Sequence, residues 1–325
     1  MRNRLLAWPL AALFLASLGL PARAADPYPT RPMRMIVAFA AGGSIDVVAR
    51  IMAQELSRSL GQAVVVENRA GASGSLGADY VAKSAPDGYT LFMGSASSLA
   101  ANAALFRNLP YDPRRDFAPV RLIGLQPNVI VVHPSLPVTS VAELIAYARA
   151  NPGRLNFGSA GSGSAQHMAA DVFRRMANID IVHVPYRGGA PALNDLIAGQ
   201  LQLMFETIPT AVEPIAAGQL RALAVTMPER VTRLPDVPTV SESGLPGYVS
   251  RGWMGIVAPA GTDPAIIDLL ARHSEAIVAM PEARQRLLGL GLEMMSNTPA
   301  EFAAFIRTEV ATYQEVVRSM GIQLD

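Results

Sequence analysis

Two loops rich in glycine and serine carry the residues of this chain that are best suited to chemistry. The first loop, residues 40–43, follows the apolar run 33–39 and precedes a helical pattern that starts at Ser44. Its glycines, Gly42 and Gly43, let the backbone approach a ligand closely, and a helix start offers unpaired N–H groups and the positive end of the helix dipole. We therefore expect a strand, a turn and a helix that together bind an anion such as a carboxylate or a phosphate. Asp46, in the first helical turn, is expected to cap free N–H groups or to fix waters above them.

The second loop repeats this arrangement in the other half of the chain. Residues 155–157 predict a strand, residues 158–164 form a loop of glycine and serine, and His167 lies at the start of the next helix. Residues 161–166 nearly match the dinucleotide fingerprint, but its third glycine is missing and no acidic residue follows at the expected place, so this match is weak. A third small polar turn, Ser95 to Ser98, ends another predicted strand. For all these loops, simple helix capping or loop flexibility is the alternative interpretation.

Side chains for covalent or metal chemistry form no pattern in the sequence. The nucleophile elbow G-x-S-x-G is absent, as is any Gly-Lys-Ser/Thr phosphate loop, and none of the four histidines has the spacing of a zinc site. The chain has no cysteine, which excludes disulfides and thiolate chemistry. His183, in an apolar strand, is expected to be a satisfied core histidine. We therefore expect no catalytic residue, no metal and no cofactor.

The first 24 residues are typical of a secretory signal peptide. Arg2 and Arg4 precede the apolar run 5–20, and residues 22–24 form an A-x-A cleavage site. The whole chain has 27 basic and 26 acidic residues, and three of the basic ones lie in this segment. The slight acidic excess of the remaining chain argues against nucleic acid as a partner.

The rest of the chain alternates between predicted strands and helices, which is typical of an α/β protein with parallel strands. Small polar turns follow several of these strands, and such turns gather at the carboxyl edge of a parallel sheet, where ligands bind. The predicted strands are 33–39, 64–66, 89–93, 129–132, 155–157, 181–184, 201–205, 220–225 and 252–257. The clearest helix starts are the capping box at Ser140, Asp263 before Pro264, and Thr298 before Pro299.

Four motifs in this order resemble one family, the Bug family of periplasmic solute receptors of tripartite tricarboxylate transporters. They are residues 39–46 (FAAGGSID), 65–71 (VVENRAG), 85–90 (APDGYT) and 184–189 (VPYRGG). The resemblance implies an α/β, two-domain periplasmic binding protein of the Venus flytrap, type II-like, with a mostly parallel sheet flanked by helices in each domain. It implies a signal peptide at 1–24, domain 1 at 25–124 and 252–325, and domain 2 at 125–251. The two hinge strands are best matched by 129–132 and 253–257.

The resemblance also implies a ligand and the residues that bind it. The ligand is a small carboxylate, such as a di- or tricarboxylate, an amino acid or an aromatic acid, and it is held by backbone N–H groups and waters. Ile45 stands where a threonine is common in the family, and Glu206 stands where aspartate is common. The expected ligand-binding residues are Phe39, Ala41, Gly42, Gly43, Ser44, Asp46, Ser95, Ser159, Ala160, Gly161, Ser162, Ser164, His167, Tyr186 and Glu206.

Three functions are compatible with these observations. The first is a monomeric periplasmic receptor that delivers a carboxylate to the membrane permease subunits of a tripartite transporter. The second is an exported α/β hydrolase or transferase that uses the same cleft, which the missing catalytic pair disfavours. The third is a ligand sensor that feeds a signalling partner, and nothing in the sequence separates it from the first.

Overall fold

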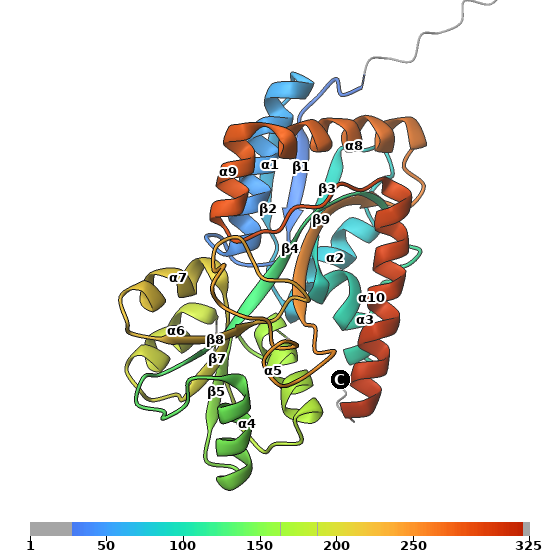
Figure 1. Ribbon diagram of the computed structural model, residues 1–325. Coiled ribbons are helices and arrows are strands. Elements are labelled where there is room, and N and C mark those ends of the chain that lie inside the picture. Colours follow the sequence, from blue (N-terminus) through green and yellow to red (C-terminus); the bar gives the residue numbers. More distant parts are fainter. Residues whose placement is uncertain (1–27, 163, 187, 321–325) are drawn as a thin grey trace, which may run out of the picture.

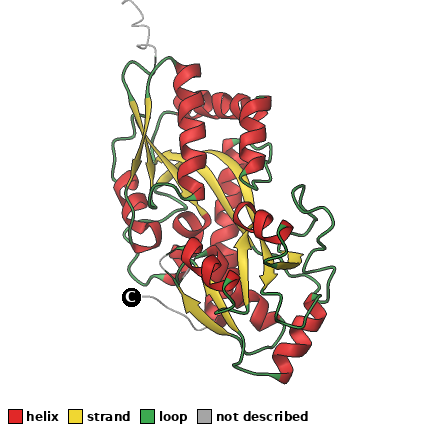
Figure 2. Ribbon diagram, turned by 90° about the vertical axis from the view of Figure 1, so that its left-hand side faces the viewer, coloured by secondary structure: helices red, strands yellow, loops and turns green. Residues whose placement is uncertain are grey.

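The structure is a computed structural model that describes residues 28–320 except 163 and 187. The expected signal peptide, residues 1–24, lies outside the described residues. Two lobes, each with strands inside and helices outside, are joined by the long strand β4 (Figure 1). Figure 2 shows the same arrangement from the side, with the strands of the two lobes flanked by helices.

The first lobe is built on a mixed sheet with the strand order β2-β1-β3-β9-β4. Strand β1 is parallel to β2 and β3, whereas β9 is antiparallel to β3 and β4. The N-terminal elements of this lobe are β1 (Met33–Val37), α1 (Ser44–Leu60), β2 (Val64–Asn68), η1 (Ala72–Gly74), α2 (Ser75–Ala82), β3 (Thr90–Ser95), η2 (Ser97–Ala101) and α3 (Asn102–Leu105). The C-terminal elements are β9 (Arg251–Pro259), α8 (Pro264–Ala279), α9 (Pro281–Gly289) and α10 (Pro299–Met320).

The second lobe has the same plan, with the strand order β6-β5-β7-β4-β8. Strand β5 is parallel to β6 and β7, and β4 is antiparallel to β7 and β8. Its remaining elements are α4 (Val141–Ala150), β5 (Asn156–Ser159), α5 (Ala165–Met176), β6 (Val182–Pro185), α6 (Gly189–Ile197), β7 (Leu203–Thr207), α7 (Ile208–Ala216) and β8 (Arg221–Val225).

Strand β4 (Phe117–Val132) belongs to both sheets. Residues 117–127 pair with β9, and residues 128–132 pair with β7 and β8. The change of partner falls between Pro127 and Asn128, and Asn128 is fixed there by bonds between its backbone and Thr226. The domain limits at 124/125 and 251/252 stay a prediction, and this change of partner is the observation that supports them.

Apolar cores lie on both sides of each sheet. One core lies between α1, α8 and the first sheet, and includes Met35, Met52 and Ile277. A second lies between the other sheet and helices α4 and α5, and includes Leu144 and Phe173. Helix α10 packs against β4, α3 and η2. Its last turns reach α5 of the other lobe, where Val317 and Met168 share a small apolar cluster (Figure 1).

Candidate functional site

A cavity of about 440 Å³ lies between the two lobes. The first lobe contributes the loop before α1 and the turn after β3, and the second lobe contributes the starts of α5, α6 and α7. The long strands contribute Gln126 on β4 and Trp253 on β9. The described residues that line it are Phe39, Ala40, Ala41, Gly43, Ser44, Ile45, Ser95, Ala96, Ser97, Gln126, Ala160, Ser164, Ala165, Gln166, Gly188, Thr207, Gly252, Trp253 and Met254.

Helix starts from both lobes meet at this cavity. Its wall includes the N-cap residues of α1, α5, α6 and α7, which are Gly43, Ser164, Gly188 and Thr207. Each helix of this kind leaves its first N–H groups without an intrahelical partner and carries partial positive charge at that end. Among the described lining residues none is Lys, Arg or His. The wall therefore attracts an anion through backbone dipoles and neutral donors.

The start of α1 supplies the donors on the side of the first lobe. The first intrahelical bond runs from Val47 N–H to Gly43 O, so the N–H groups of Ser44 and Ile45 precede the helical ladder. Gly42 has φ +85°, a left-handed conformation that glycine adopts without strain. This conformation turns the chain into the helix. The Ser44 hydroxyl accepts a 2.8 Å hydrogen bond from Gln126 Nε2 of β4, which ties the loop to the strand that joins the lobes.

Asp46 lies beneath this loop and is 2% exposed. Its carboxylate accepts hydrogen bonds from Gly42 N–H (2.9 Å), Asn68 Nδ2 (2.8 Å) and the guanidinium of Arg50 (2.9 and 3.1 Å). Burial alone would raise the pKa of Asp46, but these hydrogen bonds, led by that of Arg50, lower it. The protein's own donors thus satisfy this carboxylate, and the Gly42 N–H is committed to it.

Helix α5 supplies the corresponding donors of the second lobe. Its N-cap, Ser164, accepts a bond from His167 N–H through its hydroxyl, and its carbonyl accepts the first intrahelical bond from Met168. The N–H groups of Ala165 and Gln166 lie between these and belong to residues that line the cavity. Ser164 and Ser44 thus begin helices that approach the same space from different lobes.

Several expected ligand-binding residues lie behind the cavity wall instead of at its surface. Ser159 is fully buried, and its hydroxyl lies 2.7 Å from His183 Nε2. The ring of His167 stacks on that of His183 with centroids 4.0 Å apart. Burial lowers the pKa of both histidines, and in His183 burial and the neighbouring His167 lower it to about 4. His183 is half-buried and its Nε2 has a protein partner, so the satisfied histidine that the sequence predicts lies at the edge of the core instead of inside it.

Tyr186 and Glu206 are also held by protein partners. The Tyr186 hydroxyl donates a 2.6 Å bond to Asp195, which, with burial, raises the pKa of Tyr186 to about 12. Glu206 is 2% exposed, and its Oε1 accepts bonds from Thr207 and Thr210. Neither residue lines the cavity.

The structure thus places some of the expected ligand-binding residues in the cavity wall and others outside it. The described cavity wall includes the expected residues Phe39, Ala41, Gly43, Ser44, Ser95, Ala160 and Ser164. It does not include Gly42, Asp46, Ser159, Gly161, Ser162, His167, Tyr186 or Glu206. Sequence reasoning missed Gln126, Gln166, Thr207 and Trp253. Thr207 carried a usable signal, because it ends a strand and stands before Ile208-Pro209, where a helix begins.

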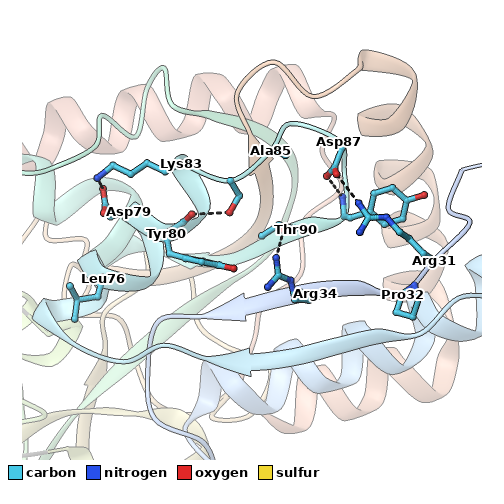
Figure 3. A pocket seen from close by; sticks show the side chains of 12 residues that line it. Arg31, Pro32, Arg34, Leu76, Asp79, Tyr80, Lys83, Ala85, Asp87 and Thr90 are labelled. Carbon is cyan, nitrogen blue, oxygen red and sulfur yellow. Dashed lines mark hydrogen bonds and ion pairs between the residues drawn. The ribbon is translucent and has the colours of Figure 1, made fainter.

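A larger cavity, of about 760 Å³, lies on the first lobe between α2 and strands β1 and β3 (Figure 3). Its charged side chains have ion-pair partners, and that of Arg34 is Glu67, outside the lining. Arg31 pairs with Asp87 at 2.9 Å, and Lys83 pairs with Asp79 at 2.6 Å. Helix α2 begins beside this cavity at Ser75, but the described lining residues all belong to the first lobe. Size alone therefore does not make it the better candidate for an anion site.

Two lobes joined by a shared strand, with helix starts of both lobes around one cavity, are the arrangement of a solute-binding protein. A family model described as "Tripartite tricarboxylate transporter family receptor" matches residues 48–322. The chain belongs to this family of receptors, which are binding proteins and not enzymes. Of the described residues, no helix is both long enough and apolar enough to cross a membrane.

Individual relatives agree with this membership. Protein BugT of Bordetella pertussis is 41% identical over 324 residues, with 99% of each chain covered. The solved structure titled "R. palustris Rpa4515 with adipate" has 38% identity and a TM-score of 0.84, covering 91% of this chain and 99% of that one. MatC from Rhodopseudomonas palustris with bound malate has 34% identity and a TM-score of 0.80, covering 89% and 100%.

Proposed function

We propose that this protein is a periplasmic receptor that binds one small dicarboxylate between its lobes and delivers it to the membrane permease of a tripartite tricarboxylate transporter. The observation that carries the proposal is the meeting of the starts of α1 and α5 at one cavity, each from a different lobe. Two separated sets of N–H donors suit a ligand with an anionic group at one end and a second polar group at the other. The adipate and malate bound to two solved relatives support this ligand class.

The mode of binding differs from a clamp of arginine side chains. Gly43, Ser44 and Ile45 offer backbone N–H groups, and Ser95, Ser97 and Ser164 offer hydroxyls. Phe39 and Trp253 add aromatic surface that suits the carbon chain of the ligand. Such a wall selects by shape and by the position of donors, since no fixed side-chain charge among its described residues dominates it.

A melting-shift panel of mono-, di- and tricarboxylates, amino acids and aromatic acids tests the binding step. A ligand at a hundred times its Kd stabilises the folded state by about 2.7 kcal/mol. Calorimetry of the best acid should then give one ligand per chain. If pure protein instead converts an ester, an amide or a bound acid, and one substitution in the cleft abolishes that turnover, the receptor proposal fails.

The export and delivery steps need a cellular test. We propose that residues 1–24 direct the chain to the periplasm and that it works there as a monomer. Deletion of the receptor should abolish uptake of the acid that binds best, and the native chain should restore it. Unchanged uptake, together with a lost transcriptional response to the acid, would instead favour the sensor function.

A further inference from the structure

Glu206 is a buried carboxyl group just behind the second-lobe wall of the cavity. It is 2% exposed and directly precedes Thr207, the N-cap of α7. Its Oε1 accepts hydrogen bonds from the Thr207 N–H (2.7 Å), the Thr207 hydroxyl (2.9 Å) and the Thr210 hydroxyl (2.8 Å). Its other oxygen, Oε2, is buried without a hydrogen-bond partner of normal geometry among the described residues. A buried carboxyl oxygen without a hydrogen-bond partner lowers the stability of the fold unless another group bonds to it.

Gln166 is the group that connects this carboxyl to the cavity. It lies in the first turn of α5, is 7% exposed and lines the cavity. Gly189 stands beside both side chains: a Cβ there would lie 3.2 Å from Gln166 Nε2 and 3.8 and 3.9 Å from the two oxygens of Glu206. The absent Cβ leaves the amide and the carboxyl room to meet. Gln166 therefore has one side toward Glu206 and the other toward the ligand space.

We propose, resting on the function proposed above, that Glu206 is a positioning residue that sets the orientation of the Gln166 amide through its own protonation state. A carboxylate accepts a hydrogen bond from Gln166 Nε2, which turns the amide oxygen toward the ligand. A protonated carboxyl donates through Oε2 to the amide oxygen, which turns the NH₂ group toward the ligand. The second-lobe wall thus offers an acceptor in the first state and a donor in the second.

The two states favour different ligands. A wall that donates suits the second carboxylate of a dicarboxylate, whereas a wall that accepts suits an amide, a hydroxyl or an ammonium group. Burial raises the pKa of Glu206, and hydrogen bonds from Thr210, Thr207 and Gln166 oppose that rise. Preference for a dicarboxylate over its monoamide should therefore decrease as the pH rises through the titration of Glu206.

Other titratable groups on the surrounding elements do not produce this dependence. His167 on α5 and His183 on β6 have pKa values lowered by burial, so both are neutral above pH 6.5. Asp195 on α6 accepts a hydrogen bond from Tyr186. Farther along α5, Asp171 is paired with Arg174 and Arg175. No ion pair joins Glu206 to any of the described side chains. Two residues of the cavity wall lie beside its carboxyl group: Thr207, which donates to Oε1, and Gln166, which lies on the side of Oε2.

Calorimetric Kd values for adipate and its monoamide, measured at pH values on both sides of the Glu206 titration as NMR of its labelled carboxyl locates it, test the proposal. The measurements stay above pH 6.5, where both adipate carboxylates are ionised and the ligands themselves contribute little pH dependence. For the wild type, we expect the ratio of the adipate Kd to the monoamide Kd to rise about tenfold or more, equivalent to about 1.4 kcal/mol. In Glu206→Gln, which cannot titrate, the ratio should stay constant.

Glu213→Gln is the matched control, because it makes the same chemical change at an exposed position of α7. It should behave as the wild type does. A merely structural role of Glu206 would weaken both ligands together in Glu206→Gln and leave the slope of their ratio unchanged. That result, or a flat ratio in the wild type, overturns the inference. If the wild type binds neither ligand and no acid of the panel, the proposed function itself fails.

Discussion

The side-chain amide of Asn68 donates a 2.8 Å hydrogen bond to Oδ1 of Asp46. The same nitrogen donates a 3.0 Å bond to the carbonyl of Phe39. Asn68 ends β2, Phe39 follows β1, and Asp46 lies in the first turn of α1. One amide therefore fixes both sides of the loop whose residues line the cavity. The geometry of this loop depends on a contact between neighbouring strands as well as on its own glycines.

This hydrogen-bond network gives a structural reason to expect that Asp46 is needed for ligand binding. From the sequence, Asp46 was expected to cap free N–H groups or to fix waters above them. The structure shows a buried carboxylate that accepts a bond from the Gly42 N–H and also holds the loop through Asn68 and Arg50. Asp46→Ala should lower the free energy of unfolding by about 2 kcal/mol, since it removes hydrogen bonds to a charged group. It should also weaken carboxylate binding about tenfold or more, because the loop loses its support.

Arg69→Ala is the control for that variant. Arg69 forms an ion pair with Glu67 and stacks on Tyr80, away from the cavity lining. Its removal should change the ligand Kd much less than Asp46→Ala does. Denaturant unfolding and calorimetry on both variants make the comparison. Full binding by Asp46→Ala and failure of Arg69→Ala would mean that a conventional arginine clamp holds the ligand.

The contribution of Asp46 to the stability of the fold should decrease in acid. The pKa of Asp46 is lower in the folded state than its ordinary value, so the folded state binds fewer protons there than the unfolded state. The stabilisation is then fully present above the ordinary aspartate pKa of about 3.9 and is lost as the pH falls below it. The stability difference between wild type and Asp46→Asn, measured by denaturant unfolding, should shrink below about pH 4. A difference that stays constant down to pH 3 would contradict the role given to the charge.

Ser44→Pro tests whether a backbone N–H holds the ligand. Ser44 is the first residue of α1, where proline is well tolerated. The preceding Gly43 has φ −74° and ψ 164°, the extended conformation that a following proline requires. The substitution removes one N–H donor from the cavity and should leave the helix intact. We expect about a tenfold or greater loss of affinity, with little change in melting temperature.

Ser44→Ala is the matched variant, because it keeps the N–H and removes only the hydroxyl that accepts from Gln126. It should bind much more tightly than Ser44→Pro. Equal losses of ligand affinity in the two variants would mean that the Ser44 hydroxyl or the shape of its side chain, and not the N–H group, holds the ligand.

The sequence predicted most elements of the fold because their patterns are local. The apolar runs and turn residues place β1, β5, β8 and the starts of α1, α8 and α10 within a residue or two of the structure. Strand β4 was recognised only at residues 129–132, although it begins at Phe117. Pro119 and Gly124 flank register shifts in its pairing with β9, so its first half lacks the regular alternation from which a strand is recognised.

The candidate site was harder to predict than the fold for a different reason. Loop composition identifies helix starts, but it does not say which side of a loop faces the cavity. Gln126 and Trp253 reach the cavity because β4 passes from one lobe to the other and the start of β9 pairs with it at that point. Ser159 and Asp46 looked equally suitable as ligand-binding residues from the sequence. Their side chains instead point into the protein and form hydrogen bonds there. Such orientation depends on tertiary packing, which a single sequence does not display.

Ligand binding should bring the two lobes closer together. Donors of α1 and α5 belong to different lobes, so a ligand that uses both sets binds best to a closed arrangement and shifts the population toward it. Small-angle scattering should show a smaller radius of gyration at saturating ligand than without ligand. An identical radius in both conditions would mean that the cleft is rigid.

His183 provides a test of the interior of the second lobe. Its Nε2 lies 2.7 Å from the hydroxyl of the buried Ser159, and its ring stacks on His167. Because Ser159 is fully buried, a fluorophosphonate probe should not label it, despite the serine–histidine contact. Labelling of Ser159 in folded protein would contradict this structural role.

The titration of His183 should make the protein less stable in mild acid. Burial, and then the neighbouring His167, lower the pKa of His183 to about 4 from an ordinary value of about 6.5. Between these values the unfolded state binds more protons than the folded state, so stability falls as the pH falls through this window and is fully present above it. Melting temperatures of His183→Gln should therefore fall less steeply than those of wild type between pH 6.5 and pH 4. His273→Gln, a change of the same kind on α8 of the other lobe, should keep the wild-type slope. Equal slopes in wild type and His183→Gln, or a His183 ring that protonates near pH 6.5 by NMR, would show that burial does not hold this imidazole neutral.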